Sequence, residues 1–165
     1  MSSNSSLNDL CKDFDEFLEQ FPGMQRDLVE MAGEKLHQKV LQNIDTAIKD
    51  ANNGSKKKSR KQPSESKGRM KDACRLVIGS SGGYAAVRND YKKAGHTHLW
   101  EFGHNIVVGG KLKPTQEDIA NGKKKGEVVR WFQGRHMYRN AVNELEDELV
   151  ADAEKMIDKL VGDLF

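Results

Sequence analysis

Residues 135–164 read RHMYRNAVNELEDELVADAEKMIDKLVGDL, and this stretch decides the architecture that the sequence predicts. Apolar residues recur in it at three- and four-residue steps, and most of the intervening positions are acidic or polar. This spacing predicts a long amphipathic helix. The apolar stripe consists of Met137, Ala141, Leu145, Leu149, Ala153, Met156, Ile157, Leu160 and Leu164.

Short apolar runs before this helix predict strands. Ile106–Val108 and Val128–Phe132 predict a strand pair, separated by an insert loop over residues 109–126. An insert of this length within a hairpin is usually functional or disordered. Residues 73–78 and 84–87 predict two further strands on either side of a glycine turn.

Two short helical segments are also predicted. Leu99 and Phe102 are three residues apart and Gly103 fits a helix C-terminus, which favours a short helix over residues 96–103, with a strand as the alternative. Residues 115–120 favour one helical turn within the insert loop.

The N-terminal part of the chain predicts two helices. A helical period runs over residues 7–21, and Pro22 is expected to break it. A second helical period runs over residues 28–48 and ends before Gly54. The predicted fold class is therefore α+β, with a small, mainly antiparallel sheet flanked by N-terminal helices and a long C-terminal helix, in a single domain spanning residues 1–165.

The net charge of +2 conceals an uneven distribution of charge. Residues 51–69 form a lysine-rich loop with almost no apolar side chain, which we expect to be mobile. The segment from Gly54 to Arg75 contains nine basic residues and two acids. The segment from Asn140 to Phe165 contains eight acids and two lysines. Opposite charges of this kind would allow copies of the chain, or a partner, to meet.

No apolar run approaches the roughly 20 residues that span a bilayer. Residues 1–6 lack the layout of a signal peptide, so we expect synthesis and residence in the cytoplasm. The cysteines, Cys11 and Cys74, are expected to be free thiols in a reducing compartment.

Three patterns suggest catalytic or binding chemistry. Residues 79–83 read GSSGG and match a nucleophile elbow, but a strand follows them instead of the required helix, so a glycine turn is favoured. The histidines His96, His98, His104 and His136 suggest a metal site, as in a metal-dependent nuclease, although surface histidines are commoner.

Glu101 lies between two aromatic residues. It is either a buried catalytic acid or a carboxylate that accepts hydrogen bonds from backbone at a packed corner. We favour the second interpretation because no other acid lies nearby in sequence to share acid–base work. The aromatic residues Trp100, Phe102, Trp131 and Phe132 are predicted to anchor the core beneath the sheet, and an interface is the alternative.

The lysine-rich loop would contact nucleic acid through phosphates, without sequence specificity. It lacks aromatic side chains for stacking on bases, so a solvated loop is favoured and contact with nucleic acid is the alternative. Its candidate contact residues are Lys56, Lys57, Lys58, Arg60 and Lys61.

Residues 94–142 resemble head–tail joining proteins of tailed bacteriophages, a family also described as tail completion or minor head–tail structural proteins. Members tend to carry a Glu-aromatic-Gly step, then Gly-Gly, then a basic step into a long acidic helix. The corresponding residues here are Trp100, Glu101, Phe102, Gly103, His104, Gly109, Gly110, Gly134, Arg135, Met137 and Ala141. The chain departs from the family at His136, where a proline is common, and in its longer insert loop.

The resemblance implies a structural virion protein with no enzymatic activity and no cofactor. Such proteins form a ring, usually a hexamer, in the phage neck, assembled in the cytoplasm of the bacterial host. The implied partners are further copies of the chain, the head connector or stopper protein, and the tail tube or tail terminator protein, with non-specific contact to the DNA that passes through and none to membrane. A tail terminator that caps the tail tube is the alternative, and a metal-dependent nuclease and a small nucleic-acid-binding protein are the rivals.

In such a ring we expect acidic and basic surfaces to meet across subunits, because a closed ring joins two different surfaces of each subunit. The candidate acids are Glu144, Asp147 and Asp152 of the C-terminal helix. The candidate bases lie in the segment from Lys67 to Arg75 and in the insert loop, where they are Lys111, Lys113, Lys123, Lys124 and Lys125.

Overall fold

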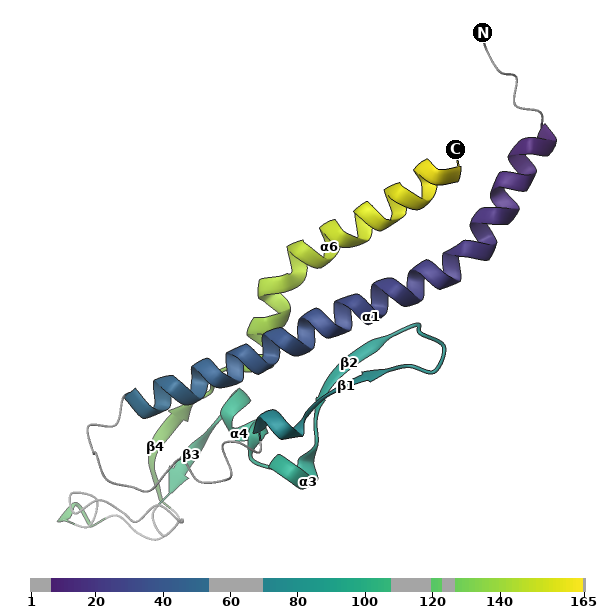
Figure 1. The fold of residues 1–165 in the computed structure, drawn as a ribbon. Helices are drawn as coiled ribbons and strands as arrows, with labels where there is room; N and C mark the ends of the chain where they lie inside the picture. The colour runs from purple at the N-terminus through teal and green to yellow at the C-terminus, as the bar shows by residue number, and fades with distance from the viewer. Residues whose placement is uncertain (1–6, 54–69, 108–119, 123–126, 165) are drawn as a thin grey trace. The chain divides into compact units, whose positions relative to one another are not determined.

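A computed structural model describes residues 7–53, 70–107, 120–122 and 127–164. Its fold is α+β, as predicted, with long helices at both ends of the chain and short hairpins between them (Figure 1). The elements are α1 (Leu7–Asn53), β1 (Cys74–Ile78), β2 (Ala85–Asn89), α3 (Tyr91–Ala94), α4 (Thr97–Phe102), β3 (Gly103–Val107), β4 (Val128–Gln133) and α6 (Met137–Leu164).

The predicted break at Pro22 is wrong, because α1 is one helix of 47 residues that passes through this proline. A proline inside a helix removes one backbone donor and bends the helix. The ribbon of α1 does change direction in its N-terminal third (Figure 1). Helical periods on both sides of Pro22 maintain the helix, and Phe17 packs on Phe21 with ring centroids 5.6 Å apart.

The strands form two separate two-stranded sheets, not the single sheet that the sequence predicts. In the first, Gly79 N donates to Tyr84 O over 2.9 Å and closes the turn between β1 and β2. In the second, β3 and β4 are antiparallel, from Gly103 opposite Gln133 to Val107 opposite Val128, with a bulge after Ile106. A two-stranded hairpin is only marginally stable by itself and needs to pack against another element.

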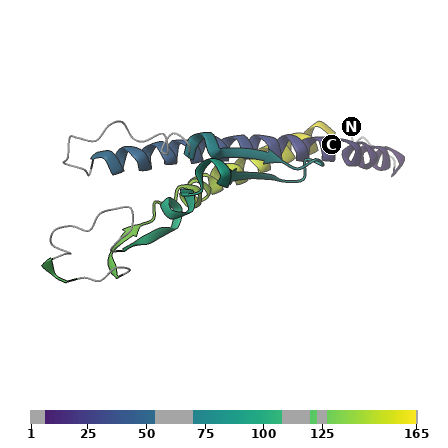
Figure 2. The same ribbon diagram turned by 90° about the horizontal axis from the view of Figure 1, so that it is seen from below.

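The chain divides into two compact units. The first comprises residues 1–41, 74–88 and 141–165, and the second comprises residues 42–73 and 89–140. In the first unit the β1–β2 hairpin runs along α1 (Figure 1 and Figure 2), and the buried apolar side chains are those of Val40, Cys74, Ala141, Leu145 and Leu160.

The second unit has a core of its own. The helical residues 70–73 contribute Met70 and Ala73, and the buried set is completed by Ile44, Ala47, Ala94 and Met137. The short helix α3, which the sequence does not predict, begins at Asp90, whose side chain accepts from Lys92 N over 3.0 Å. An aspartate at this position accepts from a backbone donor that has no partner within the helix, and so caps this single turn.

Two further segments are predicted to be helical, residues 96–103 and residues 115–120. The helix over residues 96–103 is α4, and Gly103 follows its last residue, as predicted. The helical turn over residues 115–120 lies almost wholly outside the described residues. None of the described helices has the length and the apolar composition that crossing a membrane requires.

Gly33 sets how closely α1 approaches the β1–β2 hairpin. A Cβ atom at Gly33 would lie 2.6 Å from the Cβ of Ala85 and 2.9 Å from Cδ1 of Leu76. Gly23, in the same helix, has nothing within 4 Å of that position. The two glycines therefore differ in packing while sharing a helical backbone.

We predict that Gly33→Ala lowers the free energy of unfolding by roughly 1 kcal/mol, because overpacking outweighs the gain in helix propensity. Gly23→Ala should raise it by roughly 0.5–1 kcal/mol, because only the propensity changes. Urea unfolding followed by circular dichroism measures both. Equal changes in the two variants would contradict the close approach at Gly33.

Candidate functional site

Of the residues that carry the family resemblance, those in residues 100–104 and 134–137 lie at one corner of the second unit, formed by residues 99–104 and 131–140. There α4 runs directly into β3, and β4 leads through a three-residue connection into α6. The corner is held by backbone contacts: Arg135 N donates to Trp100 O over 2.6 Å, and His136 N donates to Glu101 O over 3.1 Å.

Glu101 is the centre of this corner. Its side chain is buried, Oε2 accepts from Tyr138 N over 3.1 Å and Oε1 accepts from Arg139 N over 3.1 Å. These amides belong to the first turn of α6, where backbone donors have no partner within the helix. A carboxylate there also interacts favourably with the helix dipole. The preferred prediction for Glu101, a carboxylate that accepts from backbone at a packed corner, is confirmed.

Two glycines allow the corner to close. Gly103 has a φ of 83°, and a Cβ atom there would collide with Phe132 O and with the Trp131 ring. A Cβ atom at Gly134 would lie 2.5 Å from Glu101 O and 2.6 Å from the carbonyl carbon of Phe102. Both positions therefore require glycine, one for conformation and space together and the other for space alone.

The aromatic residues around the corner are only partly buried. Phe132 packs on Trp100 and on His104, with ring centroids 5.8 Å and 5.1 Å apart, and all three side chains are half-buried. Phe102 is 69% exposed and Trp131 is 54% exposed, so their predicted role as core anchors is wrong. Successive strand residues face opposite sides, and a hairpin of two strands has one covered side at most.

The histidines do not converge on a common point. The Nδ1 atom of His98 lies 2.7 Å from Gly95 O, whereas His104 packs on Phe132. His136 occupies the connection before α6, with a φ of 50°. Within the described ranges, no group of three or more His, Cys, Asp or Glu side chains is placed to hold a metal ion. The GSSGG segment is the turn between β1 and β2, as favoured from the sequence.

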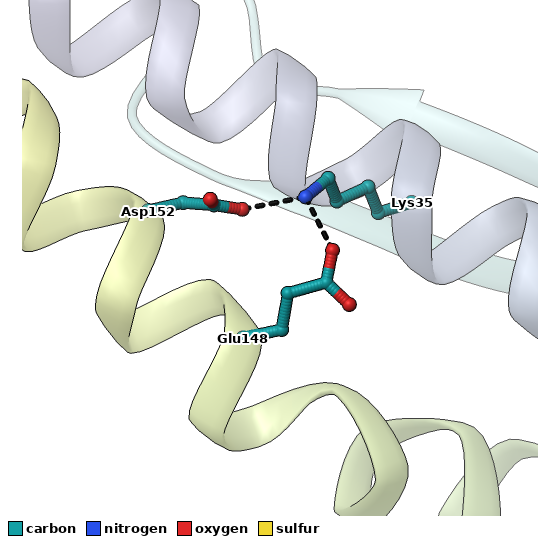
Figure 3. A network of polar contacts seen from close by, with 3 residues as sticks. All are labelled: Lys35, Glu148 and Asp152. Carbon is teal, nitrogen blue, oxygen red and sulfur yellow. Dashed lines mark hydrogen bonds and ion pairs between the residues drawn. The ribbon is translucent and has the colours of Figure 1, made fainter.

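The acids of α6 are engaged within the chain. Lys35 Nζ lies 2.6 Å from both Glu148 Oε1 and Asp152 Oδ2 (Figure 3), and Lys39 Nζ lies 2.8 Å from Glu144 Oε2. Hydrogen bonds to Asp152 and then to Glu148 raise the pKa of Lys35 above its ordinary value. All of these contacts lie in the first unit and hold α6 antiparallel to α1.

These ion pairs leave fewer acids of α6 available for the expected contacts between subunits. Glu144 and Asp152 already pair with lysines of the same chain, while Asp147 is exposed. Lys35 and Lys39 are not among the residues predicted from the sequence, although they are one helical turn apart and pair with acids at the matching spacing of residues 144, 148 and 152. That spacing was the signal that would have found them.

Several candidate residues lie outside the described residues. They are the lysine-rich loop residues Lys56, Lys57, Lys58, Arg60 and Lys61, the glycines Gly109 and Gly110, and the insert residues Lys111, Lys113, Lys123, Lys124 and Lys125.

Glu101→Gln should lower the free energy of unfolding by about 2 kcal/mol, because hydrogen bonds to a charged acceptor contribute about 1.5–3 kcal/mol and the amide group cannot accept at both positions. Urea unfolding measures the change. Glu146→Gln, at an exposed position of α6, is the matched control and should have almost no effect. A Glu101→Gln variant as stable as the control would show that the capping contact contributes little.

Lys35→Met should also destabilise the fold, since it leaves Glu148 and Asp152 close together without their cation. In a double-mutant cycle, Asp152→Asn should cost less in the Lys35→Met background than in the wild type. Because the pKa of Lys35 is raised, its contribution is complete at pH values below the ordinary lysine pKa and is lost as the pH rises through the raised value. Additive effects at neutral pH and low salt would rule out the coupling.

No family model matches the chain, and no curated protein or solved structure matches it either.

Proposed function

We propose that this chain is a structural protein of the neck of a tailed bacteriophage. Copies of it form a ring that completes the tail and joins it to the head connector, and DNA passes through this ring. The role requires that the chain hold a shape and present surfaces, with no covalent bond made or broken.

The proposal rests on the hydrogen bonds that Glu101 makes with α6. Its carboxylate is buried and accepts from two backbone amides of α6, so the most distinctive side chain of the resemblance is occupied with positioning a helix. Gly103 and Gly134 serve the same corner through close backbone approach. A segment whose characteristic residues fix geometry suits an assembly protein better than a catalyst.

The exposed surface supports the same role. Phe102 and Trp131 are large aromatic side chains that remain more than half exposed beside the corner. Exposed aromatic and aliphatic groups are commonly found where proteins dock. The corner therefore holds in place the elements that present these side chains.

The test is to remove this chain from a phage that encodes it and to examine lysates by electron microscopy. We expect filled heads and tails of normal length that remain separate, and joined virions when the wild-type chain is supplied from a plasmid. Supplying a chain that lacks residues 111–125 should leave heads and tails apart, although the variant still folds.

The same experiment distinguishes a joining protein from a tail terminator. Tails that grow beyond their normal length would indicate a tail terminator instead of a joining protein. Joined, infectious particles in the complete absence of the chain would overturn the proposal.

A further inference from the structure

The N-terminal part of α1 exposes a row of large apolar side chains. Leu10, Phe14, Leu18 and Phe21 are 41%, 54%, 66% and 40% exposed. Their spacing of three and four residues places them on one face of the helix, here called the α1 stripe. Monomeric proteins rarely leave a continuous apolar row of this size in water, so the α1 stripe is a candidate docking element.

A second apolar surface lies where α4 meets the β3–β4 hairpin. It consists of Phe102 and Trp131 and is called the aromatic surface here. Trp131 pairs with Asn105 across the strands, and its Cζ2 lies 2.7 Å from where a Cβ atom of Gly103 would be. Phe102 is the last residue of α4 and directly precedes Gly103, the first residue of β3, and Trp131 lies two ladder pairs further along the hairpin.

The charges around the two surfaces are opposite. Residues 10–21 of α1 contain four acids and one lysine, and Asp13 and Asp15 flank the α1 stripe on its two sides. Residues 89–107 and 127–140 contain five lysines or arginines and three acids, of which Glu101 is buried and accepts from backbone, Asp90 caps α3 and Glu127 is exposed. Arg130, next to Trp131, is exposed, as are Arg135 and Arg139.

We infer that the α1 stripe of one copy docks on the aromatic surface of a second copy. The two surfaces match in apolar character and oppose in charge, whereas two α1 stripes would bring acids against acids. A contact between two different surfaces leaves one of each free on every pair, so further copies add in the same way until a ring closes. This inference deepens the proposed function by naming the contact between ring subunits, and it rests on that function only for the closed ring.

The position of Cys11 allows a direct test by cross-linking. Cys11 is exposed at the edge of the α1 stripe, whereas Cys74 is buried. Wild-type chain is mixed with a size-tagged variant carrying Cys11→Ser and Asn105→Cys, so that a mixed dimer can form only between copies. Mild oxidation should trap this dimer at least about tenfold faster than with the control variant carrying Cys11→Ser and Lys155→Cys, because docking raises the local thiol concentration.

Self-association of the purified full-length chain gives an independent measurement. Leu18→Ser and Trp131→Ser should each weaken association at least about tenfold, because each removes a large side chain from the contact. The double variant should be little worse than either single variant, since both changes disrupt the same contact. Val150→Ser is the matched control, because Val150 is 53% exposed on α6 and belongs to neither surface. Thermal unfolding of each variant checks that the fold is retained.

Three results would overturn the inference: a chain that stays monomeric at every concentration, cross-linking no faster than in the control, or association that only Val150→Ser weakens. The last would place the contact on α6 while leaving the neck function intact. Conversely, a confirmed contact together with joined virions in the absence of the chain would refute the function and leave the contact standing.

Discussion

The fold of the second unit depends on the buried carboxylate of Glu101 and the two α6 amides that donate to it. Without this acceptor, the helix would begin with two partly buried donors that lack a partner, which is costly. The same carboxylate fixes the end of α4 relative to the start of α6, 37 residues later in the chain. Gly103 and Gly134 permit the close approach, and the half-buried rings of Trp100 and Phe132 pack beside it.

The sequence predicts the local elements well because each has a strong local cause. Apolar spacing defines α6, glycines mark the turn between β1 and β2, and Gly103 marks the end of α4. The failures have non-local causes. Whether Pro22 ends or only bends a helix depends on the turns around it, and whether two hairpins merge into one sheet depends on packing that no short segment encodes.

The candidate site likewise has features that the sequence predicts and features that it does not. The role of Glu101 follows from its aromatic neighbours and the lack of a second acid, so it could be predicted. The exposure of Phe102 and Trp131 could not, because aromatic composition alone does not say which face of a hairpin is covered. The acids of α6 suggested contacts between subunits, but Lys35 and Lys39 of α1 neutralise several of them within the chain.

The β3–β4 hairpin also determines how freely the sequence between its two strands can change. The register from Gly103 to Gln133 and the contact of Glu101 with α6 fix both ends of the connecting segment. Doubling the length of a flexible connection costs only about 0.6 kcal/mol in closure entropy. Evolution can therefore lengthen, shorten or recharge the sequence between Val107 and Val128 to suit a new neighbour, while the frame that carries it stays the same.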